Sequence, residues 1–300
     1  MSSIFNMQQV INGLQLGSIY ALIAIGYTLV YGIIRLVNFA HGDFYMIGVY
    51  VAYFVSTFQV ARHRPTNVFL ILLISMLSGA LVAFLTNRIA YRPLRYKPRL
   101  SALITAIGVS QFLEYGLSAL PFVGPSYRAF PTIIELKTYH IGTAVFTNYQ
   151  ILNFSTAIIL VLILAYIIRY TRLGMAMRAS SQDKDALRLM GIDLERIIDI
   201  TFLVGGALAG AAGLLAGITY PRINPYMGVV PGLKAFIAAV LGGIGNIPGA
   251  MIGAFILGIA ETFGYAINSV IGEGIAYVIL IVVLIFLPYG LFGKRTGEKV

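Results

Sequence analysis

The stretch GGALAGAAGLLAG, Gly205–Gly217, decides the fold class. It has no charged or polar side chain, and it repeats a Gly-x-x-x-Gly spacing from Gly206 and again from Gly213. Small residues four apart let two helix backbones approach closely, which is how helices associate inside a bilayer. The surrounding apolar run, residues 197–219, has the length of about 20 residues that a helix needs to cross the hydrocarbon. We expect a tightly packed membrane-spanning helix here; the spacing fits a static interior, a moving pore or a subunit interface.

The composition extends this expectation to the whole chain. Hydrophobic residues make up 59% of the 300 residues, charged residues only 11%, and the mean hydropathy is +0.87. A soluble protein with so few charges could not cover its own surface, so the composition predicts a polytopic membrane protein. The clear apolar runs are residues 10–34, 44–60, 68–90, 149–170, 197–219, 247–268 and 273–293.

Two further runs are weaker candidates for spans. Residues 100–121 contain Gln111 and Glu114, and residues 232–246 are short and contain Lys234. We expect an all-α fold with about eight transmembrane helices, one or two of them broken or re-entrant. No linker or low-complexity segment divides the chain, so residues 1–300 are expected to form a single transmembrane domain.

The positions of the basic residues predict the orientation. Arg35, the loop 88–99, the segment 169–196 and the tail after Phe292 hold fifteen of the twenty-one Lys and Arg residues, on one side if the spans alternate. Cytoplasmic loops of membrane proteins carry such an excess. We therefore expect the N-terminus outside, the C-terminus inside and the lipid bilayer as the surroundings. The basic loops are separated along the chain and lie beside membrane spans, so they do not form one continuous surface for nucleic acid. We therefore expect no nucleic-acid partner.

The sequence offers no pattern for catalysis. The chain has no cysteine, its three histidines are widely scattered, and no G-x-x-x-x-G-K-[ST] phosphate loop or H-E-x-x-H pattern occurs. We therefore expect no catalytic, metal or cofactor-binding residues, and no ATP hydrolysis by this chain itself.

One polar island interrupts the apolar sequence, at residues 178–197, RASSQDKDALRLMGIDLERI. Ser180 and Asp183 fit the S-x-x-D pattern of a helix start, with Ser180 as the N-cap. Gly191 stands where a glycine commonly ends a helix, and Asp193 can cap the next span. The island is therefore expected to hold a short helix over about 181–190.

This short helix has one apolar face. Ala186, Leu187 and Met190 group together at helical spacing, while Asp185 lies in the first turn and Arg188 in the last. A short helix of this kind can lie on the lipid surface, pack on its own domain or dock into the groove of a partner. The spacing alone leaves all three uses open.

Polar residues and glycines within the apolar runs are candidates for a transport pathway. Gly and Pro cluster in LGGIGNIPGAMIG, Leu241–Gly253, which fits either a broken helix lining a cavity or a short hairpin between two spans. Charged side chains inside a membrane tend to face protein or water, although Lys234 can extend to the outer surface instead. The candidate pathway or gating residues are Asn38, His41, Asp43, Glu114, Gly242, Gly243, Asn246 and Glu261.

Four segments together resemble the LivH-type permeases. They are NFAHGDFYMIGVY, YRPLR followed by RLSALITAIGVS, LMGIDLERIIDITFLVGGALAGAAGLL, and INPYMGVVPGLKAFIAAVLGGIGNIPGAMIGAFILGIAE. These permeases are membrane subunits of bacterial ATP-binding-cassette importers for branched-chain amino acids. The resemblance spans nearly the whole chain, except that residues 122–148 offer little to match.

The resemblance implies partners and a role. It implies a location in the bacterial inner membrane, a second homologous permease subunit and two cytosolic ATPase subunits that use the ATP. It also implies a soluble periplasmic protein that delivers leucine, isoleucine or valine to the permease. Residues of about 171–196 then form the segment that couples to an ATPase. One alternative is a related importer, because permeases of this kind also carry urea, short amides or other amino acids. A second alternative is an ion-coupled carrier, which would need Glu114 or Glu261 as its ion site. The coupling residues expected from the resemblance are Ser181, Asp183, Asp185, Ala186, Leu187, Arg188, Met190 and Gly191.

Overall fold

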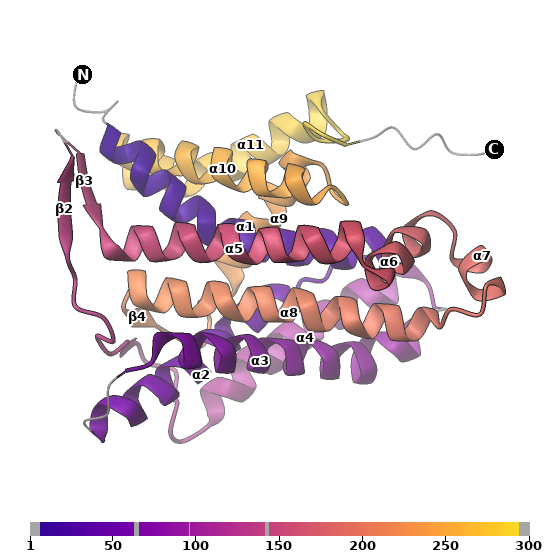
Figure 1. Ribbon diagram of the computed structural model, residues 1–300, viewed down its shortest axis with the longest axis horizontal. Helices are drawn as coiled ribbons and strands as arrows, with labels where there is room; N and C mark the ends of the chain where they lie inside the picture. The colour runs from indigo at the N-terminus through magenta and orange to yellow at the C-terminus, as the bar shows by residue number, and fades with distance from the viewer. Residues whose placement is uncertain (1–6, 63–65, 96, 142–143, 294–300) are drawn as a thin grey trace.

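The computed structural model describes residues 7–62, 66–95, 97–141 and 144–293, and it is a bundle of long helices (Figure 1). Eight helical segments in this part of the chain are long and apolar enough to cross a membrane. The all-α, polytopic expectation is therefore confirmed. The helices that form these segments are α1 (Met7–Ile34), α2 (His41–Ala61), α3 (Val68–Thr86) with its extension η1 (Asn87–Tyr91) and η2 (Arg92–Leu94), α4 (Arg99–Ala119), α5 (Asn148–Tyr170), α8 (Leu194–Thr219), α10 (Ile247–Ile267) and α11 (Ser269–Phe286).

The two weak runs have different outcomes. Residues 100–121 lie almost entirely in α4, one continuous helix in spite of Gln111 and Glu114. The run 232–246 is broken, because α9 (Val229–Gly242) has only 14 residues before the chain turns into α10. Gly243 and Gly245 make this turn with φ of 101° and 93°, a region that glycine enters without strain.

The short helix α9 corrects the expected number of crossings, because eight crossings do not fit termini on opposite sides of the membrane. Eight full crossings would return the chain to its starting side, yet α1 begins and α11 ends at opposite ends of the bundle (Figure 1). The start of α1 lies at the end with residues 138–141 and 144–147, where the Val145 amide donates to Gln8 Oε1 at 2.9 Å. The end of α11 lies at the other, where the Leu291 amide donates to the Leu241 carbonyl at 2.8 Å. When the passage along α9 is added to the eight long segments, the number of passages through the bundle is odd, as ends on opposite sides require.

Short strands occur at one end of the bundle. The strands β2 (Thr138–Ile141) and β3 (Ala144–Thr147) pair as an antiparallel hairpin just before α5, and we call this end of the molecule the hairpin end. A second pairing joins β1 (Arg128–Ala129) to β4 (Arg222–Ile223). At the opposite end lie α6 (Arg172–Gln182) and α7 (Lys184–Leu189), and we call it the α7 end (Figure 1).

The glycines of α8 explain why that helix lies in the centre. Gly210 packs on α3, where Ser75 Oγ donates to the Gly210 carbonyl at 2.6 Å and to the Gly48 carbonyl of α2 at 2.9 Å. A Cβ added at Gly206 would meet the Gly79 carbonyl of α3 at 2.3 Å. The expected close packing through the Gly-x-x-x-Gly pattern is therefore confirmed.

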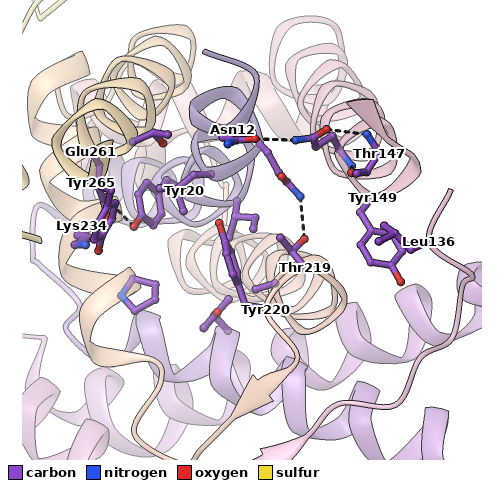
Figure 2. Close-up of a pocket in the computed structure, with 18 residues that line it drawn as sticks. Asn12, Tyr20, Leu136, Thr147, Tyr149, Thr219, Tyr220, Lys234, Glu261 and Tyr265 are labelled. Atoms are coloured by element: carbon purple, nitrogen blue, oxygen red, sulfur yellow. Dashed lines mark hydrogen bonds and ion pairs between the residues drawn. The ribbon is translucent and has the colours of Figure 1, made fainter. Parts of the chain in front are cut away.

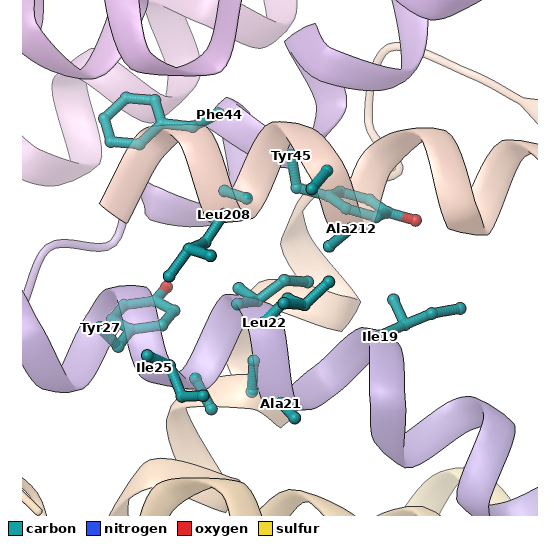
Figure 3. Packing of buried hydrophobic residues seen from close by; sticks show 14 of the residues in the cluster. Ile19, Ala21, Leu22, Ile25, Tyr27, Phe44, Tyr45, Leu208 and Ala212 are labelled. Carbon is teal, nitrogen blue, oxygen red and sulfur yellow. The ribbon is translucent and has the colours of Figure 1, made fainter. Parts of the chain in front are cut away.

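On its other side α8 packs on α1, which is buried over most of its length. Figure 3 shows this contact, with Leu22 of α1 facing Leu208 and Ala212 of α8. The pair α1–α8 forms the centre of the molecule, and the remaining helices pack around it.

Candidate functional site

A cavity of about 730 Å³ lies near the hairpin end, between α1, α5, α8, α9 and α10 (Figure 2). The cavity has a charged wall, an amide wall and an apolar lining. Its size falls in the range of about 300–1,000 Å³ that is usual for small-molecule sites.

The charged wall contains an ion pair. Lys234 Nζ of α9 contacts Glu261 Oε1 of α10, and the two residues are only 3% and 2% exposed. Tyr20 Oη of α1 donates to the other carboxylate oxygen, Glu261 Oε2, at 3.0 Å. Lys234 Nζ also lies 6.0 Å from the centre of the Tyr265 ring, within cation–π range. Figure 2 shows these four side chains gathered on one side of the cavity.

The amide wall lies opposite. Gln150 Nε2 donates to Asn12 Oδ1 at 3.0 Å, and Gln15 Nε2 donates to Thr219 Oγ1 at 3.3 Å (Figure 2). Gln150 is also part of the capping box of α5, because its Oε1 accepts from the Thr147 amide at 2.8 Å. This wall can offer both donors and acceptors to a bound molecule.

Helical spacing brings these groups together. Asn12, Leu16 and Tyr20 lie at four-residue intervals, and Ile19 lies three residues after Leu16, so these side chains share one face of α1. Leu16 and Ile19 supply apolar surface between the polar walls. The arrangement suits a small ligand with both charges and an apolar part.

Of the expected pathway residues, only Glu261 lines this cavity. Asn38, His41, Asp43 and Glu114 are all at most 5% exposed and belong to a different region, around α2 and α4. There Tyr91 Oη donates to Asn38 Oδ1 at 2.5 Å, and the His41 ring centre lies 4.6 Å from that of Tyr27.

Gly242 ends α9, Gly243 and Asn246 lie in the turn to α10, and none of the three lines the cavity. Asn246 caps α10 by accepting from the Gly249 amide at 3.1 Å, and its Nδ2 donates to the Phe292 carbonyl at 3.0 Å. This turn fastens the segment after α11 to the α7 end.

Several cavity residues were missed from sequence. Tyr20, Gln15 and Tyr265 stand in apolar runs of the sequence. Their polar atoms need hydrogen-bond partners inside a bilayer, and this requirement could have identified them as candidates. The alternative that Lys234 extends to the outer surface is wrong, because the side chain is buried against Glu261.

The polar island forms two helices rather than one. Ser180 lies inside α6, where its hydroxyl donates to the Met177 carbonyl, so the expected N-cap at Ser180 is wrong. The cap of α7 is Asp183, whose Oδ1 accepts from the Asp185 and Ala186 amides at 2.9 and 3.0 Å. Extended backbone at Asp183 separates the helices, because its φ of −146° and ψ of 111° end α6.

The end of α7 and the start of α8 follow the sequence expectation. Gly191 has a φ of 77°, its amide donates to the Arg188 carbonyl, and the Ile192 amide donates to the Leu187 carbonyl, which is a Schellman ending. Asp193 caps α8 by accepting from the Glu195 and Arg196 amides.

The apolar residues of α7 face in two directions. Leu187 is only 2% exposed and belongs to the core, whereas Met190 is 78% and Leu189 90% exposed. Asp185 and Ala186 are also exposed. The outward apolar surface is therefore Leu189–Met190, and Leu189 was missing from the expected set.

Cations surround the α6–α7 junction. Arg35 Nη2 donates to the Ser181 carbonyl at 3.3 Å, which joins the end of α1 to α6. Burial, together with the positive charges of Arg35, Arg95 and Arg188, lowers the pKa of Lys184. Arg95 is paired with Glu195 and Arg188 with Asp185, so the junction carries charges of both signs.

Replacing Gly191 with alanine is expected to loosen α7. No atom lies within 4 Å of the added Cβ, so the effect comes from the positive φ alone, about 1–2 kcal/mol for a residue other than glycine. Hydrogen exchange of the 184–191 amides should rise, and less so in Gly191→Asn, because asparagine tolerates this conformation better. Equal exchange in Gly191→Ala and the unaltered chain would contradict the expectation.

Comparison with known proteins decides the family. Residues 9–287 match the family model described as "Branched-chain amino acid transport system / permease component". The chain belongs to this permease family. No solved structure matches this permease.

Three relatives show the extent of the similarity. The high-affinity branched-chain amino acid permease protein LivH of Escherichia coli K12 is 42% identical over 308 residues, which cover 99% of this chain and 98% of that protein. LivH of Salmonella typhimurium is 41% identical with the same coverage. BraD of Pseudomonas aeruginosa is 42% identical over 303 residues, which cover 98% of each chain. The similarity therefore includes residues 122–148, which the motifs alone did not match.

Proposed function

We propose that this permease is the membrane subunit of an ATP-driven importer that moves branched-chain amino acids into the cytoplasm. The observation that carries the proposal is the similarity to permeases of that name over nearly the full chain. The cavity supports it, because charged, amide and apolar surfaces around one space suit a small amino acid. The chain supplies the pathway, and separate subunits supply the energy.

The orientation follows from charge. The α7 end holds the basic segments 88–95 and 169–196, so it faces the cytoplasm, and the hairpin end with the cavity faces outward. In the bacterial inner membrane, a periplasmic binding protein then delivers the amino acid at the hairpin end. A second homologous permease subunit completes the membrane part.

Two cytosolic ATPase subunits act at the α7 end. The short helix α7 has defined caps at both ends and presents Leu189 and Met190 to the outside. An apolar pair so exposed on a polar, positively charged loop suits a groove on a partner protein. ATP-driven closure of the ATPases would move α7. The movement would pass inward through α8, because its N-cap Asp193 lies only two residues after Gly191, where α7 ends.

Uptake by the reconstituted complex tests the transport function. Proteoliposomes that hold this chain with its permease, ATPase and binding-protein partners should accumulate leucine only when ATP is present. A complex without this chain is the control and should accumulate none. Leucine uptake driven by an ion gradient through this chain alone would contradict the proposal.

Cross-linking tests the docking surface. The chain contains no cysteine, so Leu189→Cys introduces the only thiol of this subunit. That thiol is expected to cross-link to an ATPase subunit in the complex, with a yield that changes when ATP is added. Thr138→Cys in β2, at the hairpin end, is the matched control and should give no ATPase adduct. The reverse pattern would overturn the orientation.

A further inference from the structure

We propose that the Lys234–Glu261 pair opens to receive the carboxylate and ammonium groups of the amino acid, which makes the cavity a zwitterion-binding site. The inference rests on the proposed function and assigns its substrate contacts. Lys234 takes the carboxylate of the ligand, and Glu261 Oε1, which Lys234 releases, takes its ammonium group while Tyr20 Oη keeps its hydrogen bond to Glu261 Oε2. Leu16 and Ile19 face the aliphatic side chain of the ligand. Nothing in this exchange is transferred covalently.

The first support is that a buried ion pair of this kind contributes little to the stability of the fold. Removing two charges from water is seldom repaid by their attraction, and apolar replacements of buried pairs are often neutral or stabilising. Ionised side chains within membrane helices accordingly mark ligand or ion pathways more often than simple packing. Here both residues are almost fully buried, yet both line the cavity.

The second support is charge balance. A zwitterion and the ion pair are each neutral overall, so exchanging one internal pair for two pairs with the ligand leaves no unmatched charge in the low-dielectric interior. A ligand with only one of the two charges would leave Lys234 or Glu261 without a partner, which is strongly unfavourable. The site should therefore discriminate by charge pattern.

The third support is the distribution of the remaining groups. Tyr20 already holds Glu261 Oε2, so the carboxylate keeps a hydrogen bond when Lys234 leaves. Tyr265 lies over the same ammonium group, so Lys234 also keeps a favourable contact. Both partners can separate without losing every stabilising neighbour, which a pair enclosed by aliphatic residues could not do.

Thiol protection in the complete importer tests the site. Leu16→Cys places a single thiol of this chain on the apolar part of the cavity wall, and its rate of reaction with a small methanethiosulfonate reagent reports occupancy. Leucine should slow the reaction. Leucinamide and 4-methylpentanoate have the same side chain but lack the carboxylate or the ammonium charge, and neither should slow it at equal concentration. Thr138→Cys should react at one rate under all conditions.

Two double variants separate binding from folding. In the Leu16→Cys chain, Lys234→Met with Glu261→Gln removes both charges together, so no buried charge is left alone, and unfolding temperature in detergent should change little. The leucine concentration for half-protection should rise about tenfold or more, because hydrogen bonds to charged groups are lost. Lys234→Glu with Glu261→Lys keeps an ion pair but exchanges the positions of its charges, and it should also lose protection while staying folded.

The outcomes distinguish this inference from the proposed function. Protection by all three compounds, or full leucine protection in either folded double variant, would overturn the zwitterion site even if the complex imports leucine. Failure of the complex to import any branched-chain amino acid, with leucine-specific protection intact, would instead overturn the transport function and leave the site standing.

Discussion

Replacing Gly210 with alanine is expected to lower the stability of the permease by close to 3 kcal/mol, the upper end of the usual range of about 1–3 kcal/mol for overpacking. The added Cβ would lie 2.2 Å from the Ser75 carbonyl oxygen of α3, and a backbone atom cannot move aside as a flexible side chain does. Separation of α3 from α8 would also weaken the hydrogen bond from Ser75 Oγ to the Gly210 carbonyl. Thermal unfolding in detergent and the yield of monodisperse protein measure the loss.

Gly108→Ala is the matched control. Gly108 also lies within a membrane-spanning helix, α4, but no atom lies within 4 Å of an added Cβ there. Since alanine favours the helix more than glycine does, stability should stay equal or rise slightly. Equal unfolding temperatures for Gly210→Ala and Gly108→Ala would show that α3 and α8 do not meet as described.

Replacing Leu187 with aspartate is expected to disrupt α7 itself. The side chain is 2% exposed and belongs to the core, so the carboxylate would be buried without a partner, at about 3 kcal/mol or more once the lost apolar contacts are included. Hydrogen exchange of the 184–191 amides should rise to that of a disordered loop. ATP-driven uptake should disappear together with this local structure.

Leu189→Asp should separate docking from folding. Because Leu189 is 90% exposed, its replacement should leave the exchange rates and the unfolding temperature unchanged. Uptake should nevertheless fall strongly, since the proposed ATPase groove would have to bury a carboxylate. Full uptake by Leu189→Asp would remove this residue from the coupling contact, and full uptake by a folded Leu187→Asp would contradict its burial.

The membrane helices were predictable because one physical requirement sets both their length and their composition. A span needs about 20 apolar residues, so runs such as 149–170 and 197–219 appear in the sequence with nearly their structural bounds. The break after α9 was also visible, in the Gly and Pro residues of 241–253. Whether the number of passages is odd or even was not visible, because the 14 residues of α9 are fewer than a recognisable membrane span needs.

The site was less predictable, because its residues come from distant parts of the chain. Tyr20 and Glu261 are 241 positions apart, and no local pattern indicates that they meet. Glu261 stood out through its charge, whereas the partner role of Lys234 depends on how α9 packs on α10. The cap at Asp183 was misplaced for a local reason: Ser180 and Asp183 both fit the beginning of a helix, and the sequence does not show that α6 already contains the serine.

The double role of Gln150 makes one side of the cavity harder to change than the other when the selectivity of the permease evolves or is engineered. One side chain closes the first turn of α5 and faces the cavity, so a change there alters the ligand surface and frays a 23-residue helix together. Thr262, across the cavity, donates its hydroxyl only to the Gly258 carbonyl of its own helix. New specificities should therefore accumulate at Thr262 of α10, while Gln150 of α5 stays fixed.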